Sequence, residues 1–286
     1  MISVIIPVYN EEMNISTVVK GVKRIIGEDD EILVINDGST DKTKEIADAA
    51  GAKVISHHDN IGNGAAVKTG IRSAKGDIIV LIDGDGQHNP DDITRMVNLL
   101  ERHDMVVGAR TKDSEASFHR NFANRLFNIF AAYLTKKKIS DLTSGFRAVK
   151  GPLAKKFVYL LPNTFSYPTT LTLSIIRSGY SVGYTPIKTF KRKGKSKINP
   201  VLDGIRFFLI MLKIATLFSP LRVFLPISLV FLLAGISNYI YTFMVYHRFT
   251  NMSAMLIING ILIFLMGLVS EQIAQLRLDR TEDEDR

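Results

Sequence analysis

Two aspartates and a glutamine alternate directly after an apolar segment, at Asp83, Asp85 and Gln87. In an extended chain, residues i and i+2 point to the same side, so these three side chains can present oxygen atoms to one point. Hard oxygen ligands suit Mg²⁺ or Mn²⁺, and both ions bind the phosphates of nucleoside diphosphates. An isolated Asp-x-Asp is also common as a solvated turn. The position of this one after the apolar run 78–82 favours a metal and nucleotide site.

Polar residues also follow two earlier apolar runs, at 9–12 (Tyr-Asn-Glu-Glu) and 36–39 (Asn-Asp-Gly-Ser). Each segment alone could be only a turn or a helix cap. Ligands of parallel sheets bind beyond the carboxyl ends of the strands, so three such segments at one edge predict a nucleotide site.

The first hundred residues must supply the elements that carry these segments. Apolar runs at 3–8, 31–35, 53–56 and 77–82 alternate with stretches of helical spacing. Continuous apolar strands that alternate with helices predict an α/β fold, with a mostly parallel, Rossmann-like sheet covered on both faces.

The last quarter of the chain has a different character. The runs 223–245 and 252–269 carry no charge and are joined by a short polar link. As helices they would extend roughly 34 and 27 Å, close to the roughly 30 Å of a bilayer core. We therefore predict a transmembrane hairpin over 220–270, preceded by an amphipathic interfacial helix over 201–219 and followed by an acidic tail over 271–286. The alternatives are a buried helical pair and an ordinary packed helix.

The net charge of +8 is unevenly distributed along the chain. Basic residues gather at 188–197, before the first span, whereas the link between the spans contributes only Arg248 as a fixed positive charge. The positive-inside rule then predicts a multi-pass protein of the cell membrane, with its large N-terminal domain cytoplasmic. The basic excess lies beside the membrane, and its run 191–197 contains no aromatic residue, so no nucleic-acid partner is expected.

The chain contains no cysteine, which excludes disulfides, thiolate catalysis and cysteine-ligated zinc. Its composition, 46% hydrophobic and 22% charged, excludes a disordered chain.

Four segments together resemble a known enzyme family. Residues 5–12, 34–41 and 83–88 resemble the inverting family 2 glycosyltransferases of GT-A fold. The segment 141–147 (Asp-Leu-Thr-Ser-Gly-Phe-Arg) resembles one of the branch that contains dolichol-phosphate mannose synthases and other polyprenyl-phosphate glycosyltransferases. The resemblance runs from residue 2 to about 200 and implies a GT-A catalytic domain over 1–200. It also implies a UDP- or GDP-linked sugar as donor, Mg²⁺ or Mn²⁺ as cofactor, and dolichyl or undecaprenyl phosphate as acceptor.

The resemblance assigns the donor side of the site. The metal on the diphosphate would be bound by Asp85 and Gln87. The residues that would contact the nucleotide or its phosphates are Pro7, Tyr9, Glu11, Asp37, Asp83, Arg192 and Lys197.

The acceptor side is assigned in the same way, to Arg110, Arg120 and Asn124. Arg120 and Asn124 share one face of an expected helix with Asn128, and two guanidinium groups suit a phosphate. The acceptor phosphate is ionised at neutral pH and needs little deprotonation. Asp85, Arg120 and Arg192 are therefore the expected catalytic residues, and in-line attack would invert the anomeric centre.

Other functions remain open on the sequence alone. The chain could transfer sugar to a different acceptor, or it could be a catalytically silent membrane adaptor that binds nucleotide. A processive polysaccharide synthase usually carries Gln-x-x-Arg-Trp, which a chain without tryptophan lacks. A sugar nucleotidyltransferase would have a glycine-rich loop where residues 9–11 stand. A homo-oligomer is also compatible with the sequence.

Overall fold

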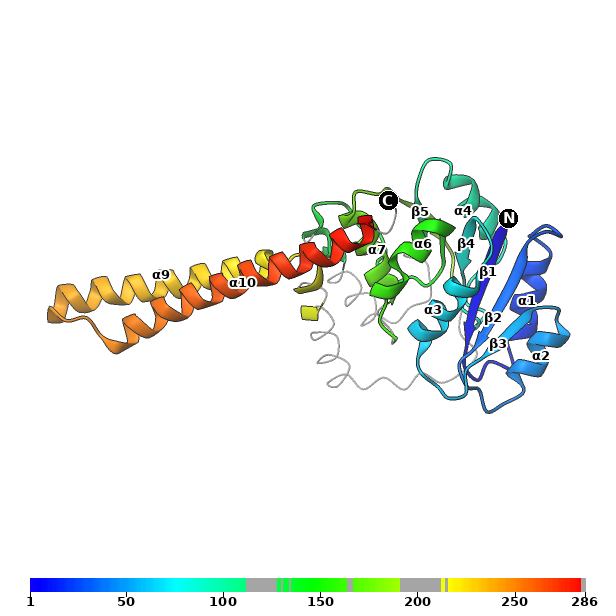
Figure 1. Cartoon of the computed structure of the whole chain (residues 1–286), viewed down its shortest axis with the longest axis horizontal. Helices are drawn as coiled ribbons and strands as arrows, with labels where there is room; N and C mark the ends of the chain where they lie inside the picture. The colour runs from blue at the N-terminus through cyan, green and yellow to red at the C-terminus, as the bar shows by residue number, and fades with distance from the viewer. Residues whose placement is uncertain are drawn as a thin grey trace. The chain divides into compact units, whose positions relative to one another are not determined.

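The computed structural model describes residues 1–111, 128–129, 131–133, 135–163, 167–190, 212–213 and 216–283, with side chains as far as residue 276. The chain forms two compact units, Met1–Lys197 and Ile198–Arg286 (Figure 1). The first is built around a sheet and the second around a helical hairpin.

The first unit contains a seven-stranded sheet with the order β3-β2-β1-β4-β6-β5-β7. Every neighbouring pair is parallel except those of β6, which runs antiparallel to both β4 and β5. This arrangement confirms the predicted α/β class with a mostly parallel sheet. The strands are β1 (Ile2–Val8), β2 (Glu31–Asn36), β3 (Lys53–Ser56), β4 (Ile78–Leu81), β5 (Met105–Arg110), β6 (Arg147–Lys150) and β7 (Val182–Ile187).

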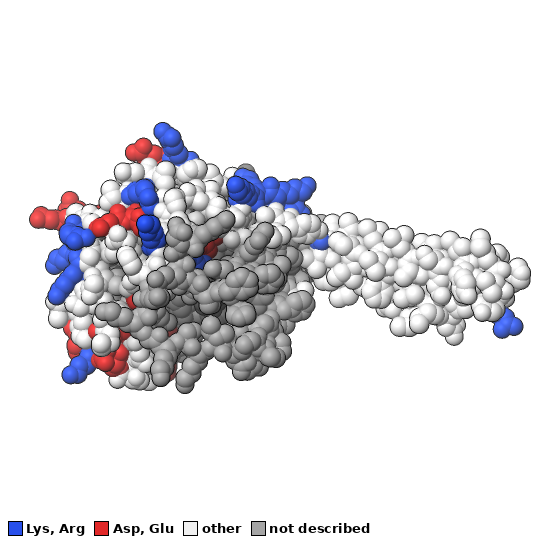
Figure 2. Space-filling view, turned by 180° about the vertical axis from the view of Figure 1, so that it is seen from behind, with Lys and Arg blue, Asp and Glu red and all other residues white. Residues whose placement is uncertain are grey.

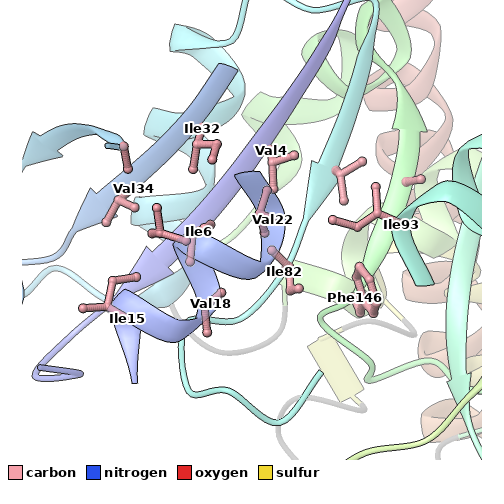
Figure 3. Packing of buried hydrophobic residues seen from close by; sticks show 14 of the residues in the cluster. Val4, Ile6, Ile15, Val18, Val22, Ile32, Val34, Ile82, Ile93 and Phe146 are labelled. Carbon is pink, nitrogen blue, oxygen red and sulfur yellow. The ribbon is translucent and has the colours of Figure 1, made fainter. Parts of the chain in front are cut away.

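Helices cover both faces of the sheet, because alternate residues of each strand point to opposite sides. Val4 and Ile6 of β1 pack with one group of helices, whereas Ile5 packs with the other. Figure 3 shows the first of these cores, in which Ile15, Val18 and Val22 of a helix lie over the strands. The first face is covered by α1 (Ile15–Lys23), α2 (Thr43–Ala49) and α4 (Asp92–Leu99), and the second by α3 (Asn63–Ser73), α6 (Gly151–Phe157), the 3₁₀ turn η1 (Val158–Leu160) and α7 (Tyr167–Arg177).

The strand register brings the predicted polar segments to one edge. Val8 at the end of β1 pairs with Asn36 at the end of β2, and Ile5 of β1 pairs with Leu81 of β4. Because these strands are parallel, the loops that begin at residues 9, 37 and 82 leave the sheet in the same direction.

The second unit is dominated by two long helices, α9 (Leu221–Tyr246) and α10 (Asn251–Asp283), which pack against each other. Both are long and apolar enough to cross a bilayer, and most of their side chains are exposed rather than buried in a protein core. In the face of the hairpin seen in Figure 2, Lys and Arg atoms appear only near its ends. These properties match the predicted hairpin and argue against a buried pair in a soluble domain.

Small and polar residues hold the two helices together. A side chain at Gly235 or Gly260 would collide with the facing helix, so glycine at both positions permits close backbone contact. Ser228 donates to the carbonyl of Gly260 at 2.8 Å, and Asn238 donates to Ser253 at 2.9 Å. These bonds satisfy polar groups inside the hairpin, as an apolar surrounding requires.

Two boundaries of the predicted layout can be compared with the described residues. Helix α10 continues to Asp283, so most of the segment predicted as an acidic tail is helical. The predicted amphipathic helix over 201–219 lies outside the described residues except for 212–213 and 216–219, and it stays a prediction.

Candidate functional site

The first two polar loops of the sheet edge are joined by hydrogen bonds. Asn10, whose φ of 54° is left-handed, donates its backbone N–H to Ser39 Oγ at 2.9 Å and accepts from the N–H of Thr40 at 2.9 Å. The N–H of Glu11 donates to Thr43 Oγ1 at 2.9 Å. The loop after β1 is therefore held in place by the loop after β2.

The predicted donor residues of the first loop differ in exposure. Tyr9 is exposed and free to meet a ligand, whereas Pro7 is buried within β1. Glu11 is also buried, and its Oε2 accepts from Asn14 Nδ2 at 2.8 Å. Only Tyr9 of these three presents a large surface at the edge, so Pro7 and Glu11 shape the loop around it.

Asp37 is almost fully buried and supports a neighbouring loop. Its carboxylate accepts from the backbone N–H groups of Ile61 at 3.1 Å and Gly62 at 2.8 Å, and lies 2.7 Å from His57 Nδ1. His57 Nε2 in turn lies 2.8 Å from Thr69 Oγ1. Direct contact between Asp37 and the nucleotide stays a prediction, because in the structure this carboxylate positions the loop 57–62. His57 was not expected from the sequence, because its partners Asp37 and Thr69 are distant in the chain.

The loop after β4 carries the predicted metal ligands. Asp85 Oδ1 accepts from the N–H of Gln87 at 3.1 Å. Gln87 Nε2 donates to the carbonyl of Phe190 at 3.2 Å, and Gln87 accepts from the N–H of Phe190 at 2.9 Å. The side-chain oxygen of Gln87 is not used by these bonds. The loop after β4 is thus bonded to Phe190, the residue that directly precedes the basic run 191–197.

The oxygen donors of this loop fit a metal that is completed by ligand oxygens. No cluster of three or more His, Asp or Glu side chains forms a closed metal cage within the described residues. Asp83, Asp85 and Gln87 provide two carboxylates and an amide. Mg²⁺ commonly takes one or two carboxylates and fills its other positions with phosphates and water, so an incomplete protein ligand set suits it.

His88 ends the segment 83–88, and nothing in the sequence indicated its role. It is buried, its ring centroid is 5.2 Å from that of Phe146, and its Nε2 lies 3.5 Å from Asp83 Oδ2. Its Nδ1 has no hydrogen-bond partner among the described residues. His88 therefore packs between the core and the Asp83 carboxylate.

The turn 141–147 begins with a buried ion pair. Arg110 Nε donates to Asp141 Oδ2 at 2.8 Å, and Arg110 Nη2 donates to Asp141 Oδ1 at 2.9 Å. Asp141 also accepts from the N–H groups of Thr143 and Ser144, each at 3.1 Å. Burial alone would raise the pKa of Asp141, but its bonds with Arg110 outweigh burial and hold that pKa below its usual value. The carboxylate therefore stays ionised and fixes the turn.

The same turn ends with a second arginine, which is fully buried. Arg147 donates to the carbonyls of Ser144 at 2.7 Å and Leu142 at 2.8 Å, both within the turn. It also donates to the carbonyl of Pro168 at 2.6 Å and to Thr172 Oγ1, in the first turns of α7. Burial lowers the pKa of Arg147 to about 10, so it remains charged at neutral pH. Arg147 thereby connects the turn to α7.

The turn lies directly against Asp83, the first aspartate of the loop after β4. A Cβ atom at Gly145 would overlap Asp83 Oδ2 and would lie 2.8 Å from Asp83 Cγ. Only a residue without a side chain allows this approach. Arg110 and Arg147 hold the turn in place. The backbone at Gly145 therefore limits where the Asp83 carboxylate can lie.

The predicted acceptor residues are only partly described. Arg110 uses Nε and Nη2 for Asp141, and Nη2 also bonds Thr143 Oγ1, so Nη1 has no hydrogen bond within the described part of the chain. Arg120, Asn124, Arg192 and Lys197 lie outside the described residues, and their roles stay predictions.

Replacement of Gly145 by alanine tests whether the turn positions Asp83. The new Cβ would displace the Asp83 carboxylate rather than unfold the protein, because a side chain end moves more easily than backbone. We expect the affinity for Mn²⁺ with nucleoside diphosphate, measured by isothermal titration, to fall about tenfold or more, with a nearly unchanged melting temperature. The control is Gly27→Ala, whose Cβ would lie an ordinary 3.5 Å from the carboxylate of Asp30. Equal affinities in both variants would disprove the positioning role.

Each of the two units of the chain matches a known protein family model. Residues 3–157 match the family model "Glycosyl transferase family 2", and residues 219–276 match "GtrB C-terminal hairpin". Uncharacterized protein MJ1222 of Methanocaldococcus jannaschii is 33% identical over 226 residues, which are 74% of this chain and 92% of that protein.

Other relatives are more distant or matched over a shorter part. The undecaprenyl-phosphate 4-deoxy-4-formamido-L-arabinose transferase of Edwardsiella ictaluri is 31% identical over 59% of this chain, but the match spans only 57% of that enzyme. Glucosyl-3-phosphoglycerate synthase of Mycobacterium tuberculosis, solved with Mn²⁺ and UDP-glucose, shares the fold with a TM-score of 0.61. It is 21% identical, covering 75% of this chain and 78% of its own. The chain belongs to glycosyltransferase family 2, and its catalytic unit has the GT-A fold of a glycosyltransferase.

Proposed function

We propose that this glycosyltransferase transfers a sugar from a nucleoside-diphosphate sugar to a polyprenyl phosphate, dolichyl or undecaprenyl, and so makes a lipid-linked phosphosugar. The observation that carries the proposal is the presence, in one chain, of a family 2 domain and a hairpin long and apolar enough to cross a bilayer. A soluble acceptor would not require such a hairpin. Relatives that are named undecaprenyl-phosphate transferases support the same acceptor class.

The donor site in this proposal is the edge at which β1, β2 and β4 end. Tyr9 is the exposed aromatic residue available to the nucleotide base, and Asp83 lies fixed against Gly145. Asp85 and Gln87 would hold a divalent cation, Mg²⁺ or Mn²⁺, and a relative of the same fold was solved with Mn²⁺ and UDP-glucose. The bound cation would stabilise negative charge on the leaving nucleoside diphosphate. Arg192 and Lys197 would neutralise the same phosphates.

The acceptor phosphate would bind on the Arg110 side of the turn 141–147. Arg110 keeps Nη1 for a new acceptor while Asp141 fixes the rest of its guanidinium. Arg120 and Asn124 are proposed to complete the phosphate site, where charge-assisted bonds from arginine are strong. The phosphate oxygen is already ionised at neutral pH, so attack on the sugar needs no strong general base and would invert the anomeric centre.

The proposed orientation has the catalytic unit in the cytoplasm, where nucleotide sugars are made. Basic residues precede α9, whereas Arg248 is the one lysine or arginine between α9 and α10. This distribution favours a short external link by the positive-inside rule.

The transfer reaction and its metal dependence can be measured together. Membranes that contain the full chain are incubated with polyprenyl phosphate and radiolabelled UDP- and GDP-sugars, and label is counted in the organic phase. We expect one donor to give lipid product, EDTA to abolish transfer, and Mg²⁺ or Mn²⁺ to restore it. Asp85→Asn should lower transfer by about a hundredfold or more, in the range of a lost electrostatic contact in a transition state.

The matched control is Asp29→Asn, at an exposed turn away from the site, which should retain full transfer. Undiminished transfer in EDTA would refute the metal assignment. Label that stays in the aqueous phase with every donor would refute the lipid acceptor.

The orientation can be read from cysteine labelling, because the chain has no cysteine of its own. In intact cells, an impermeant maleimide should label Arg248→Cys in the link. It should label Lys44→Cys, exposed on α2, only after the membrane is permeabilised. The reverse pattern would place the catalytic unit outside.

A further inference from the structure

One exposed edge of the catalytic unit combines apolar and basic side chains that the proposed chemistry does not use. Residues 128–129, 131–133 and 135 are helical, and Ile129 and Tyr133 are 58% and 53% exposed. Because they are four residues apart, both side chains lie on the same face of this helix. Lys136, Lys137 and Lys138 follow directly and are all exposed. We call the surface formed by Ile129, Tyr133, Lys136, Lys137 and Lys138 the basic-apolar edge.

Backbone hydrogen bonds end the helix at Lys136, directly after the exposed side chains of Ile129 and Tyr133. The N–H of Lys136 donates to the carbonyl of Ala132 at 2.8 Å, and its left-handed φ of 56° ends the helix. Thr135 Oγ1 then accepts from the N–H of Lys137 at 3.3 Å. Buried Ala131 and Ile139 anchor the segment to the core on its other side. The three lysines make no ion pair with a carboxylate of the described residues.

We propose that the basic-apolar edge docks on the anionic surface of the bilayer to which the hairpin attaches the enzyme. Exposed apolar side chains next to lysines are the combination that binds a membrane interface, where each lysine adds about fivefold to binding. The hairpin belongs to the same chain and keeps the catalytic unit at a high local concentration near the bilayer. A lipid surface is thus a partner that the hairpin keeps close to the catalytic unit.

Docking would also position Arg110, the arginine proposed to bind the acceptor phosphate. This part of the proposal rests on the proposed function. Asn128, the residue before the edge, donates to the carbonyl of Ser140 at 2.9 Å and accepts from the N–H of Leu142 at 3.0 Å. Between these two partners lies Asp141, which is bonded to Arg110. The helix that carries the edge is therefore linked by two hydrogen bonds to the turn that pairs with Arg110, the arginine proposed to bind the phosphate. A docked edge would hold Arg110 near the headgroup layer, where a lipid phosphate lies.

A tryptophan reporter tests the docking, because the chain contains no natural tryptophan. Full-length Tyr133→Trp is purified and reconstituted in phosphatidylcholine vesicles, with or without phosphatidylglycerol, that carry brominated acyl chains. We expect blue-shifted emission and strong quenching, stronger with phosphatidylglycerol and weaker at high salt. The control Tyr159→Trp lies on η1 and is 44% exposed, and it should be quenched little in either vesicle.

A second set of variants tests the lysines. Replacing all three of residues 136–138 by glutamine, in the Tyr133→Trp background, should reduce the quenching to the level of the control. It should also raise the apparent KM for polyprenyl phosphate in vesicles at least threefold, while the affinity for nucleoside diphosphate stays unchanged. A matched triple change to glutamine at exposed lysines elsewhere should do neither; the sites are Lys42, Lys44 and Lys53.

The outcomes separate this proposal from the proposed function. Docking on an anionic surface would be overturned if the two tryptophan reporters were quenched equally. It would also be overturned if quenching were the same with and without phosphatidylglycerol, even if lipid product still forms. Quenching confined to Tyr133→Trp together with no lipid product from any donor would support the docking and refute the polyprenyl-phosphate acceptor.

Discussion

Two arginines hold the turn 141–147, and the geometry of the site depends on this arrangement. Arg110 binds the carboxylate that begins the turn, and Arg147 binds carbonyls within it and in α7. Arg147 is fully buried, so its charge would stay desolvated if these hydrogen bonds were lost, and this end of the turn is held firmly. Gly145 then brings the backbone of this rigid turn against Asp83. One short segment thereby fixes Asp83, proposed for the donor side, and Arg110, proposed for the acceptor side.

The sheet topology explains why residues so far apart in the chain meet here. Strand β6 begins at Arg147 and inserts antiparallel between β4 and β5, with Arg147 paired to Leu81. The turn before β6 therefore lies beside the loop that follows β4, which contains Asp83. The same insertion places the turn next to β5, whose last residue is Arg110. The arrangement of the proposed site thus follows from one antiparallel strand within an otherwise parallel sheet.

The sequence was sufficient for features that depend on local pattern. Apolar runs that end in polar residues predicted β1, β2 and β4 and their common edge, and uninterrupted apolar runs predicted α9 and α10. It was insufficient where a side chain's partner is remote. Nothing near Asp37 in the chain indicates that its carboxylate is bonded to Ile61 and Gly62, and nothing near Arg110 indicates its pairing with Asp141. Such roles are decided by long-range pairing, which periodicity does not encode.

We propose that the turn 141–147 positions Asp83 close to Asp85, which would bind the metal. The most direct test is a structure of the full chain in lipid with Mn²⁺ and a nucleoside diphosphate, in which the anomalous signal locates the metal. The account predicts Mn²⁺ on the Asp85 carboxylate, Asp83 still against Gly145, the turn unchanged, and Arg192 and Lys197 at the diphosphate. Mn²⁺ bound away from Asp85, or a turn rearranged so that Asp83 leaves Gly145, would contradict it.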